Sequence, residues 1–258
     1  GKTTDMSVLT EVEDLKAVIA YASSLPFTDE SRIVLIGASQ GGFVSALTAA
    51  QMGNKIERLV LFYPALCIPD DARKGQMMFA KFDPAEIPSV IRCGPMKLGH
   101  VYPEAVMEMD PFKEIAPYQG PVLIIHGSED KIVDLSYAKR AREAYVQCQL
   151  RVVMGAGHGF SKKDDETAIP WMRDFLSESF FIGDFSADSL LVFGFWAGVN
   201  VCQPLCDFGH RHDSSGFRNG WTEQMFPRYI NCGSQGVSRW RHSDARRSVH
   251  RPQGWLRL

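Results

Sequence analysis

The feature that most constrains this chain is residues 33–50, IVLIGASQGGFVSALTAA, where an apolar strand pattern runs through Gly-Ala-Ser-Gln-Gly-Gly directly into a helix pattern. Gly37 and Gly41 permit a tight strand-to-helix turn, and Gly42 lets the helix start close to the strand. In an open α/β sheet, ligands bind beyond the carboxyl ends of the strands. We therefore expect Ser39 to stand at such an end with its hydroxyl above the sheet.

Strand and helix patterns alternate up to about residue 177. We expect strands at 32–37, 57–62, 121–126 and about 149–154, and helices at 7–25, about 41–53, about 134–147 and about 166–177. Near-continuous apolar strands that alternate with amphipathic helices are typical of a parallel sheet covered on both faces. The prediction is an α/β fold, mainly a parallel sheet with flanking helices. In the first helix, Ser7 followed by Glu11 marks the start.

The alternation pauses at about 65–120, in a stretch rich in proline. A long insertion between two core strands is usually functional, because binding surfaces are built on segments that the scaffold positions. We interpret this insertion as a cap over a substrate pocket, within a domain that covers residues 1–177.

A serine hydroxyl is a weak nucleophile, so catalysis would need a histidine to take its proton and an acid to orient that histidine. The strand at 121–126 is followed by HGSEDKIV, which contains Asp130, and the strand at 149–154 is followed by GAGHGF, which contains His158. The chain order Ser39, Asp130, His158 matches the Ser, acid, His order of α/β-hydrolases.

Several alternatives stay open at this point. The glycine-rich turn could cradle a phosphate, although it lacks the P-loop lysine and the dinucleotide spacing. Asp130 could be a turn residue, with Glu129 or Asp134 as the working acid. His126 ends a core strand and reads as a structural histidine rather than the base, and His158 could be an ordinary loop residue.

Composition excludes other classes of function. The net charge of −2 offers no basic field, so we expect no nucleic-acid partner. Irregular cysteine spacing and the lack of a signal-peptide pattern favour the cytoplasm. The longest apolar run, LLVFGFWAGV, has about half of the roughly 20 residues that span a bilayer, so we expect no membrane partner.

Residues 178–258 differ in character from the preceding domain. Eleven lysines fall in residues 1–177 and none in 178–258, whereas the tail holds nine arginines and four of the five tryptophans. We interpret the tail as an extension with little order or a segment translated out of frame. Its zinc-type side chains have an unusual spacing, so we expect no metal site there; they are Cys202, Cys206, His210, His212 and Cys232.

GASQGG, HGSEDKIV and GAGHGFS resemble the nucleophile, acid and histidine motifs of serine α/β-hydrolases, and more narrowly those of bacterial cinnamoyl or feruloyl esterases. The resemblance implies that Ser39 is the nucleophile, His158 the general base and acid, and Asp130 the residue that orients it. It also implies an oxyanion donor in the backbone N–H of Gln40.

The same resemblance extends to the cap. IPDDARKGQ and GHVYPE are similar to segments with which these esterases contact the phenolic end of a hydroxycinnamoyl group. The candidate substrate-binding residues are Asp71, Gln76 and Tyr102. Without the resemblance, each would be interpreted as a solvated cap residue.

In this family, strands and a His-Gly loop that supplies a second oxyanion donor come before the segment matching residue 1. Strand 32–37 is therefore expected to have an open edge, which is an aggregation hazard and leaves a homodimer open. Because of the open edge, we expect poor solubility. Losing one oxyanion donor costs on the order of 100- to 1000-fold in rate in proteases, so we also expect weak turnover.

The sequence thus predicts a carboxylic-ester hydrolase that works through an acyl-enzyme on small aromatic esters, feruloyl or cinnamoyl, without cofactor or metal. The alternatives are another serine hydrolase of this fold, such as an aminopeptidase or short-chain lipase, or a non-catalytic fragment that binds a ligand or another chain.

Overall fold

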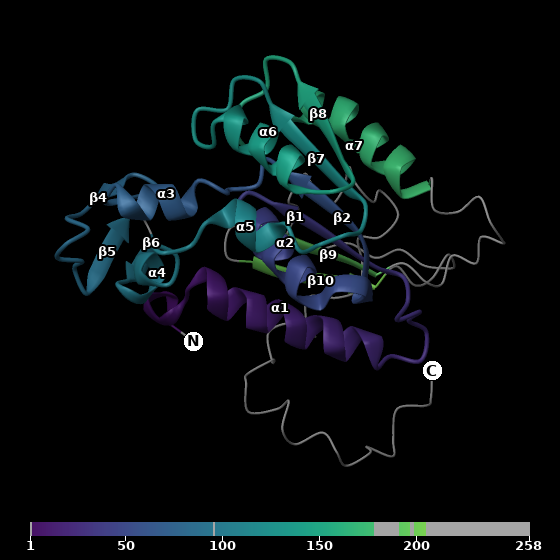
Figure 1. The fold of residues 1–258 in the computed structure, drawn as a ribbon, viewed down its shortest axis with the longest axis horizontal. Helices are drawn as coiled ribbons and strands as arrows, with labels where there is room; N and C mark the ends of the chain where they lie inside the picture. Colours follow the sequence, from purple (N-terminus) through teal and green to yellow (C-terminus); the bar gives the residue numbers. More distant parts are fainter. Residues whose placement is uncertain (1, 95, 178–190, 197–198, 205–258) are drawn as a thin grey trace, which may run out of the picture. The chain divides into compact units, whose positions relative to one another are not determined.

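A computed structural model describes residues 2–94, 96–177, 191–196 and 199–204 (Figure 1). The helices are η1 (Thr3–Asp5), α1 (Val8–Ser23), α2 (Gln40–Met52), η2 (Gly53–Lys55), α3 (Ile68–Arg73), α4 (Val101–Glu104), α5 (Pro111–Ile115), α6 (Leu135–Ala144) and α7 (Lys162–Ser177). The strands are β1 (Ile33–Ala38), β2 (Ile56–Phe62), β3 (Gln76–Met77), β4 (Ala80–Lys81), β5 (Val90–Cys93), β6 (Met96–Gly99), β7 (Val122–Gly127), β8 (Cys148–Val153), β9 (Leu191–Trp196) and β10 (Val199–Pro204).

The main sheet has the order β10-β9-β1-β2-β7-β8. All neighbouring strands are parallel except β10, which runs antiparallel to β9. Strands β1 and β7, which each have a neighbour on both sides, are buried along their whole length, as expected for strands covered on both faces. The predicted α/β fold with a mainly parallel sheet is confirmed.

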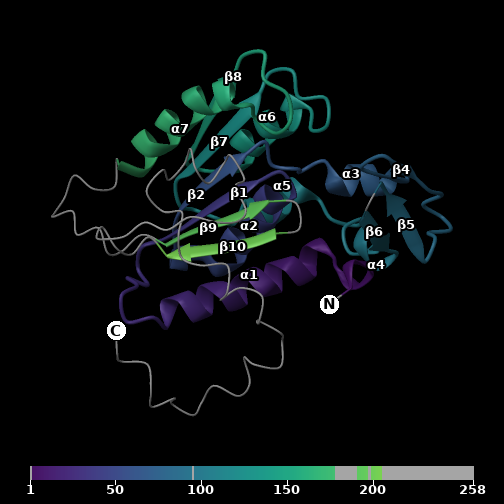
Figure 2. The same cartoon turned by 180° about the vertical axis from the view of Figure 1, so that it is seen from behind.

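Strand alternation divides the core between two helical layers. Ile33, Leu35, Leu59 and Leu61 share one hydrophobic cluster with buried residues of α1, α2, α5 and α6. The intervening strand positions face the opposite side, where Arg58 of β2 donates from Nη1 to the backbone oxygen of Phe175 in α7 at 2.9 Å. Figures 1 and 2 show the sheet between these helices. Because β1, β2, β7 and β8 run parallel, their carboxyl ends lie along one edge of the sheet.

The predicted insertion contains α3, two short antiparallel hairpins (β3–β4 and β5–β6), α4 and α5. Its β6 and α4 contact η1 at the start of the chain (Figures 1 and 2). The hairpins are too short to leave a period in the sequence, which explains why the sequence indicates an interruption and not its elements.

One sequence-based expectation was wrong. The edge of β1 that the sequence leaves open is paired in parallel with β9, with Leu35 opposite Phe193. The tail therefore contains two strands of the main sheet, although no strand period was evident there. The predicted start of the first helix is confirmed, because Ser7 is the N-cap of α1, and its partner in the capping box is Thr10, the N3 residue whose side chain accepts from the Ser7 N–H.

Candidate active site

Ser39 occupies the turn between β1 and α2 in a backbone conformation that side chains seldom adopt, with φ 53° and ψ −124°. Its N–H donates to the Phe62 oxygen at 3.0 Å, and its carbonyl accepts from Gly42 N–H at 3.0 Å and Ala65 N–H at 2.9 Å. These bonds to β2, to the loop after β2 and to the first turn of α2 hold the strained conformation in place. The predicted tight strand-to-helix turn is present.

Gly37 is required by this turn because α2 starts against it. A Cβ atom at Gly37 would lie 2.4 Å from the Gly41 oxygen and 2.5 Å from Ser45 Oγ. Any larger residue would push α2 away from β1 and displace Ser39.

The structure brings Ser39, His158 and Asp130 into one hydrogen-bonded chain. Ser39 Oγ lies 2.8 Å from His158 Nε2, and His158 Nδ1 lies 2.8 Å from Asp130 Oδ2. The Asp130 carboxylate accepts the Nδ1 proton, which leaves Nε2 as the nitrogen that can accept from the serine hydroxyl. A phosphate cradle would need no such histidine.

Asp130 is the carboxylate that contacts His158, and the other two candidates lie elsewhere. Glu129 is exposed, and Asp134 caps α6 by accepting from Ser136 N–H at 2.9 Å. Burial disfavours the ionised form of Asp130, but hydrogen bonds from His126, His158 and Val133 N–H outweigh burial and hold its pKa well below the usual range. The acid therefore stays ionised beside the histidine at neutral pH.

His126 is fully buried and stands beside the acid. Its Nε2 donates to the Val133 oxygen at 2.9 Å and lies 3.4 Å from Asp130 Oδ2. Its Nδ1 has no hydrogen-bond partner among the residues the structure describes. His126 therefore has the contacts of a structural histidine, and its ring supports the loop that carries Asp130.

Gln40 begins α2 directly after Ser39. Its backbone N–H is one of the first in the helix and has no acceptor within that helix. Its carboxamide joins two other segments: Nε2 donates to Glu11 Oε2 of α1, and Oε1 accepts from the Tyr102 hydroxyl of α4 at 2.8 Å.

The three cap candidates are placed differently. Tyr102 is 2% exposed and donates to Gln40, which belongs to the strand-to-helix turn at residues 37–42, here called the elbow. Asp71 is half-buried in α3, where burial raises its pKa despite a hydrogen bond with Cys67. Gln76 is exposed on the β3–β4 hairpin and donates to the Met78 oxygen at 3.3 Å. Tyr102 is thus the one of the three with a hydrogen bond to an elbow residue.

Two residues beside the hydrogen-bonded chain were not found from the sequence. Tyr63 is fully buried with φ 35°, and its ring packs edge-on against His158 with centroids 4.8 Å apart. Glu11 touches the elbow through Gln40. Tyr63 leaves no sequence signal, whereas Glu11 is a carboxylate in the otherwise apolar face of α1 and could have been noticed.

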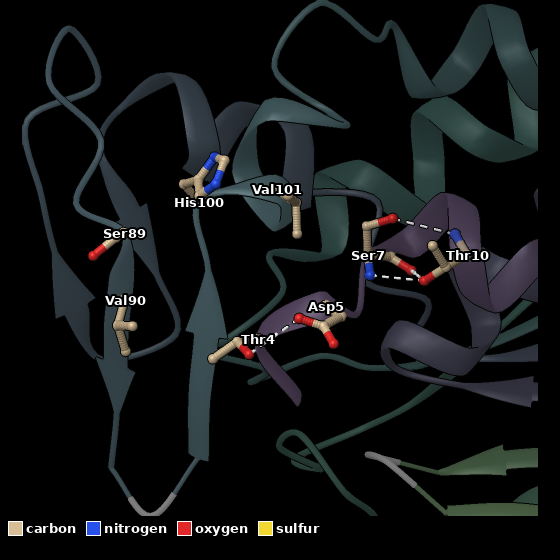
Figure 3. A pocket seen from close by; sticks show the side chains of 8 residues that line it. All are labelled: Thr4, Asp5, Ser7, Thr10, Ser89, Val90, His100 and Val101. Atoms are coloured by element: carbon tan, nitrogen blue, oxygen red, sulfur yellow. Dashed lines mark hydrogen bonds between the residues drawn. The ribbon is translucent and has the colours of Figure 1, made fainter. Parts of the chain in front are cut away.

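A separate hollow lies between η1, the start of α1 and the cap (Figure 3). It is lined by Thr4, Asp5, Ser7, Thr10, Ser89, Val90, His100 and Val101. None of the predicted site residues lines it, so the hollow is distinct from the Ser39 site.

Among the described residues, no group of three His, Cys, Asp or Glu side chains is arranged to hold a metal ion. The side chains of the tail cysteines and histidines considered for zinc lie outside the described part of the chain. Within the same described residues, none of the helices has the length and apolar character needed to cross a membrane.

The parallel sheet, its flanking helices and the Ser39 turn at a strand end define an α/β-hydrolase. The chain belongs to the dienelactone hydrolase family, which it matches over residues 2–175. It is also 26% identical over 137 residues to the uncharacterized peptidase YtmA of Bacillus subtilis (strain 168), a match covering 52% of this chain. The chain spans 49% of the length of that relative.

Solved structures give the same fold. Est1E from Butyrivibrio proteoclasticus is 28% identical with a TM-score of 0.61, over 67% of this chain and 72% of Est1E. A second structure of Est1E, with ferulic acid bound, is 29% identical with a TM-score of 0.64, over 69% of this chain and 70% of that one. Both structures therefore support the α/β-hydrolase fold of this chain.

Proposed function

We propose that this chain hydrolyses carboxylic esters through an acyl-enzyme on Ser39. The observation that carries the proposal is the chain of two 2.8 Å contacts from Ser39 Oγ through His158 to Asp130. Membership of a hydrolase family and the likeness to Est1E support it.

In the proposed mechanism, His158 Nε2 takes the hydroxyl proton as Ser39 Oγ attacks the ester carbonyl. Asp130 holds the ring in the tautomer with the proton on Nδ1 and stabilises the imidazolium that forms. The backbone N–H of Gln40 donates to the oxyanion. His158 then protonates the leaving alcohol and later activates the water that releases the acid.

We propose small aromatic esters, of the feruloyl or cinnamoyl kind, as the substrate class. The ferulic acid bound to Est1E supports this choice, as do the cap candidates Asp71, Gln76 and Tyr102. The name of the YtmA relative makes an aminoacyl amide the competing substrate.

The first test is labelling of the purified chain with a fluorophosphonate, which reacts with an activated serine. Labelling at Ser39, located by peptide mass spectrometry, should disappear in Ser39→Ala and in His158→Ala. Absence of labelling in the folded wild-type chain would favour the non-catalytic alternative.

The substrate is tested by rates on methyl ferulate, a short aliphatic nitrophenyl ester and an aminoacyl amide. We expect methyl ferulate to be hydrolysed with the highest kcat/KM. A strong preference for the amide would refute the esterase proposal, and a preference for the aliphatic ester would refute the aromatic substrate class.

A further inference from the structure

Three segments that are distant in the sequence meet at the Gln40 carboxamide. Glu11 comes from α1, Gln40 from the first turn of α2, and Tyr102 from α4 in the cap. Glu11 Oε2 accepts from Gln40 Nε2, and Gln40 Oε1 accepts from the Tyr102 hydroxyl at 2.8 Å. Gln40 is also the residue whose backbone N–H follows the candidate nucleophile.

Glu11 is buried where an apolar residue would be expected. It is 5% exposed, and its neighbours on the same helix face, Val8, Val12 and Leu15, are all core residues. Burial is the main cause that raises its pKa, the hydrogen bond from Gln40 lowers it and nearby Asp14 raises it, with a net pKa of about 7. If this position served packing alone, a leucine would suit it better, because burying a carboxyl group costs free energy. The buried carboxyl group of Glu11 therefore indicates a role other than packing.

The chemistry of the three partners fixes the orientation of the carboxamide. A carboxamide has a donating end and an accepting end, and a carboxylate oxygen can only accept. In its ionised form, which the hydrogen bond from Gln40 favours, Glu11 therefore binds the Nε2 end, and Oε1 accepts from the Tyr102 hydroxyl. These two bonds restrain the Gln40 side chain at the first turn of α2.

We propose that Glu11 is a positioning residue, which acts through the Gln40 side chain to hold the Gln40 backbone N–H at the oxyanion position and to join the cap to the elbow through Tyr102. This inference rests on the proposed function, since the oxyanion is formed at Ser39. Glu11 itself touches neither substrate nor the reacting atoms.

The test is a double-mutant cycle read by the kinetics of fluorophosphonate labelling, with the maximal rate and the half-saturating concentration measured separately. Because misplacing a catalytic group by about 1 Å can cost on the order of 100-fold, we expect Glu11→Ala and Gln40→Met each to lower the maximal rate by at least about tenfold. The half-saturating concentration should change by less than about threefold in both. The double variant should be no slower than either single variant, because both remove the same link.

Glu11→Gln supplies the conservative rescue, since its amide oxygen can still accept from Gln40 Nε2. It should label within about threefold of wild type. Glu13→Ala is the matched control, because Glu13 is on the same helix with its side chain 71% exposed and pairs with Lys16. Circular dichroism checks folding, and if Glu11→Ala does not fold, Glu11→Leu, which fills the space and removes the acceptor, takes its place in the cycle.

The outcomes separate the two proposals. Multiplicative losses in the double variant, or wild-type labelling in Glu11→Ala, would overturn the role of Glu11 and leave Ser39 chemistry intact. No labelling of folded wild-type chain would overturn the proposed function, and the role of Glu11 with it.

Discussion

Asp130 uses its two oxygens for different purposes. Oδ1 accepts from Ile132 N–H and Val133 N–H, both at 2.9 Å, which fixes the loop after β7. Oδ2 lies 2.8 Å from His158 Nδ1 and 3.4 Å from His126 Nε2. The same carboxylate thus shapes its own loop and selects the tautomer of the histidine.

Replacing Asp130 with asparagine should keep the loop bonds but present an amide donor to His158. The ring would then carry its proton on Nε2 and could not accept from Ser39. By analogy with serine proteases, we expect kcat to fall on the order of 10⁴-fold. The assay is ester hydrolysis at saturating substrate, with circular dichroism to verify folding.

Asp134→Asn is the matched control, because asparagine caps helices as well as aspartate and Asp134 caps α6. It should retain kcat within about twofold. An Asp130→Asn enzyme with more than a tenth of wild-type activity would contradict the orienting role of Asp130.

The sequence predicted Ser39, Asp130 and His158 because each follows a strand in a short motif, and parallel strands bring their carboxyl ends to one edge. It could not predict the support around them. Whether a carboxylate in an apolar helix face is buried against a partner, as Glu11 is, depends on the side chain of Gln40 that approaches it, 29 residues away in the chain.

The start of α1 is held by a reciprocal cap. Thr10 N–H donates to Ser7 Oγ at 3.2 Å, and Ser7 N–H donates to Thr10 Oγ1 at 2.9 Å. Because α1 carries Glu11 one turn further on, this cap also sets where Glu11 meets Gln40. The core helices and strands were predicted to within a few residues from their periodicity, whereas these cap partners depend on the exact first residue of the helix.

Ser7→Ala should lower the free energy of unfolding by about 1 kcal/mol, because one helical N–H loses its acceptor. Ser24→Ala tests the other end of α1, where the Ser24 hydroxyl donates to the Tyr21 oxygen in an exposed position. That change should cost less than about 0.5 kcal/mol. Urea unfolding followed by circular dichroism would measure both, and equal losses would argue against the cap at Ser7.

At the scale of the whole molecule, the main sheet combines strands that come before α7 in the sequence with two strands, β9 and β10, that come after it. β1 lies between β2, which follows it closely in the chain, and β9, which comes more than 150 residues later. The tail was interpreted from its composition as foreign to the domain, because a strand of six residues inside a biased segment has too few positions to establish a period.

Phe193→Pro removes a backbone N–H from β9, which lies between β10 and β1 and so uses its N–H groups on both sides. Pairing with β1 should weaken, and an apolar strand edge should become accessible to other chains. We expect more aggregate in size-exclusion chromatography with light scattering. Phe193→Ala, which keeps the N–H, is the control, and an unchanged elution profile for Phe193→Pro would show that β9 does not protect β1.

The left-handed backbone of Ser39 sets stability and chemistry against each other at a single position. At φ 53° a serine is strained and a glycine would not be, so glycine at residue 39 would relieve the turn while removing the hydroxyl. Selection for robustness alone would therefore favour loss of the serine. Ser39 is kept in a half-buried, hydrogen-bonded turn at some cost in stability, and the rest of the domain must be stable enough to tolerate it.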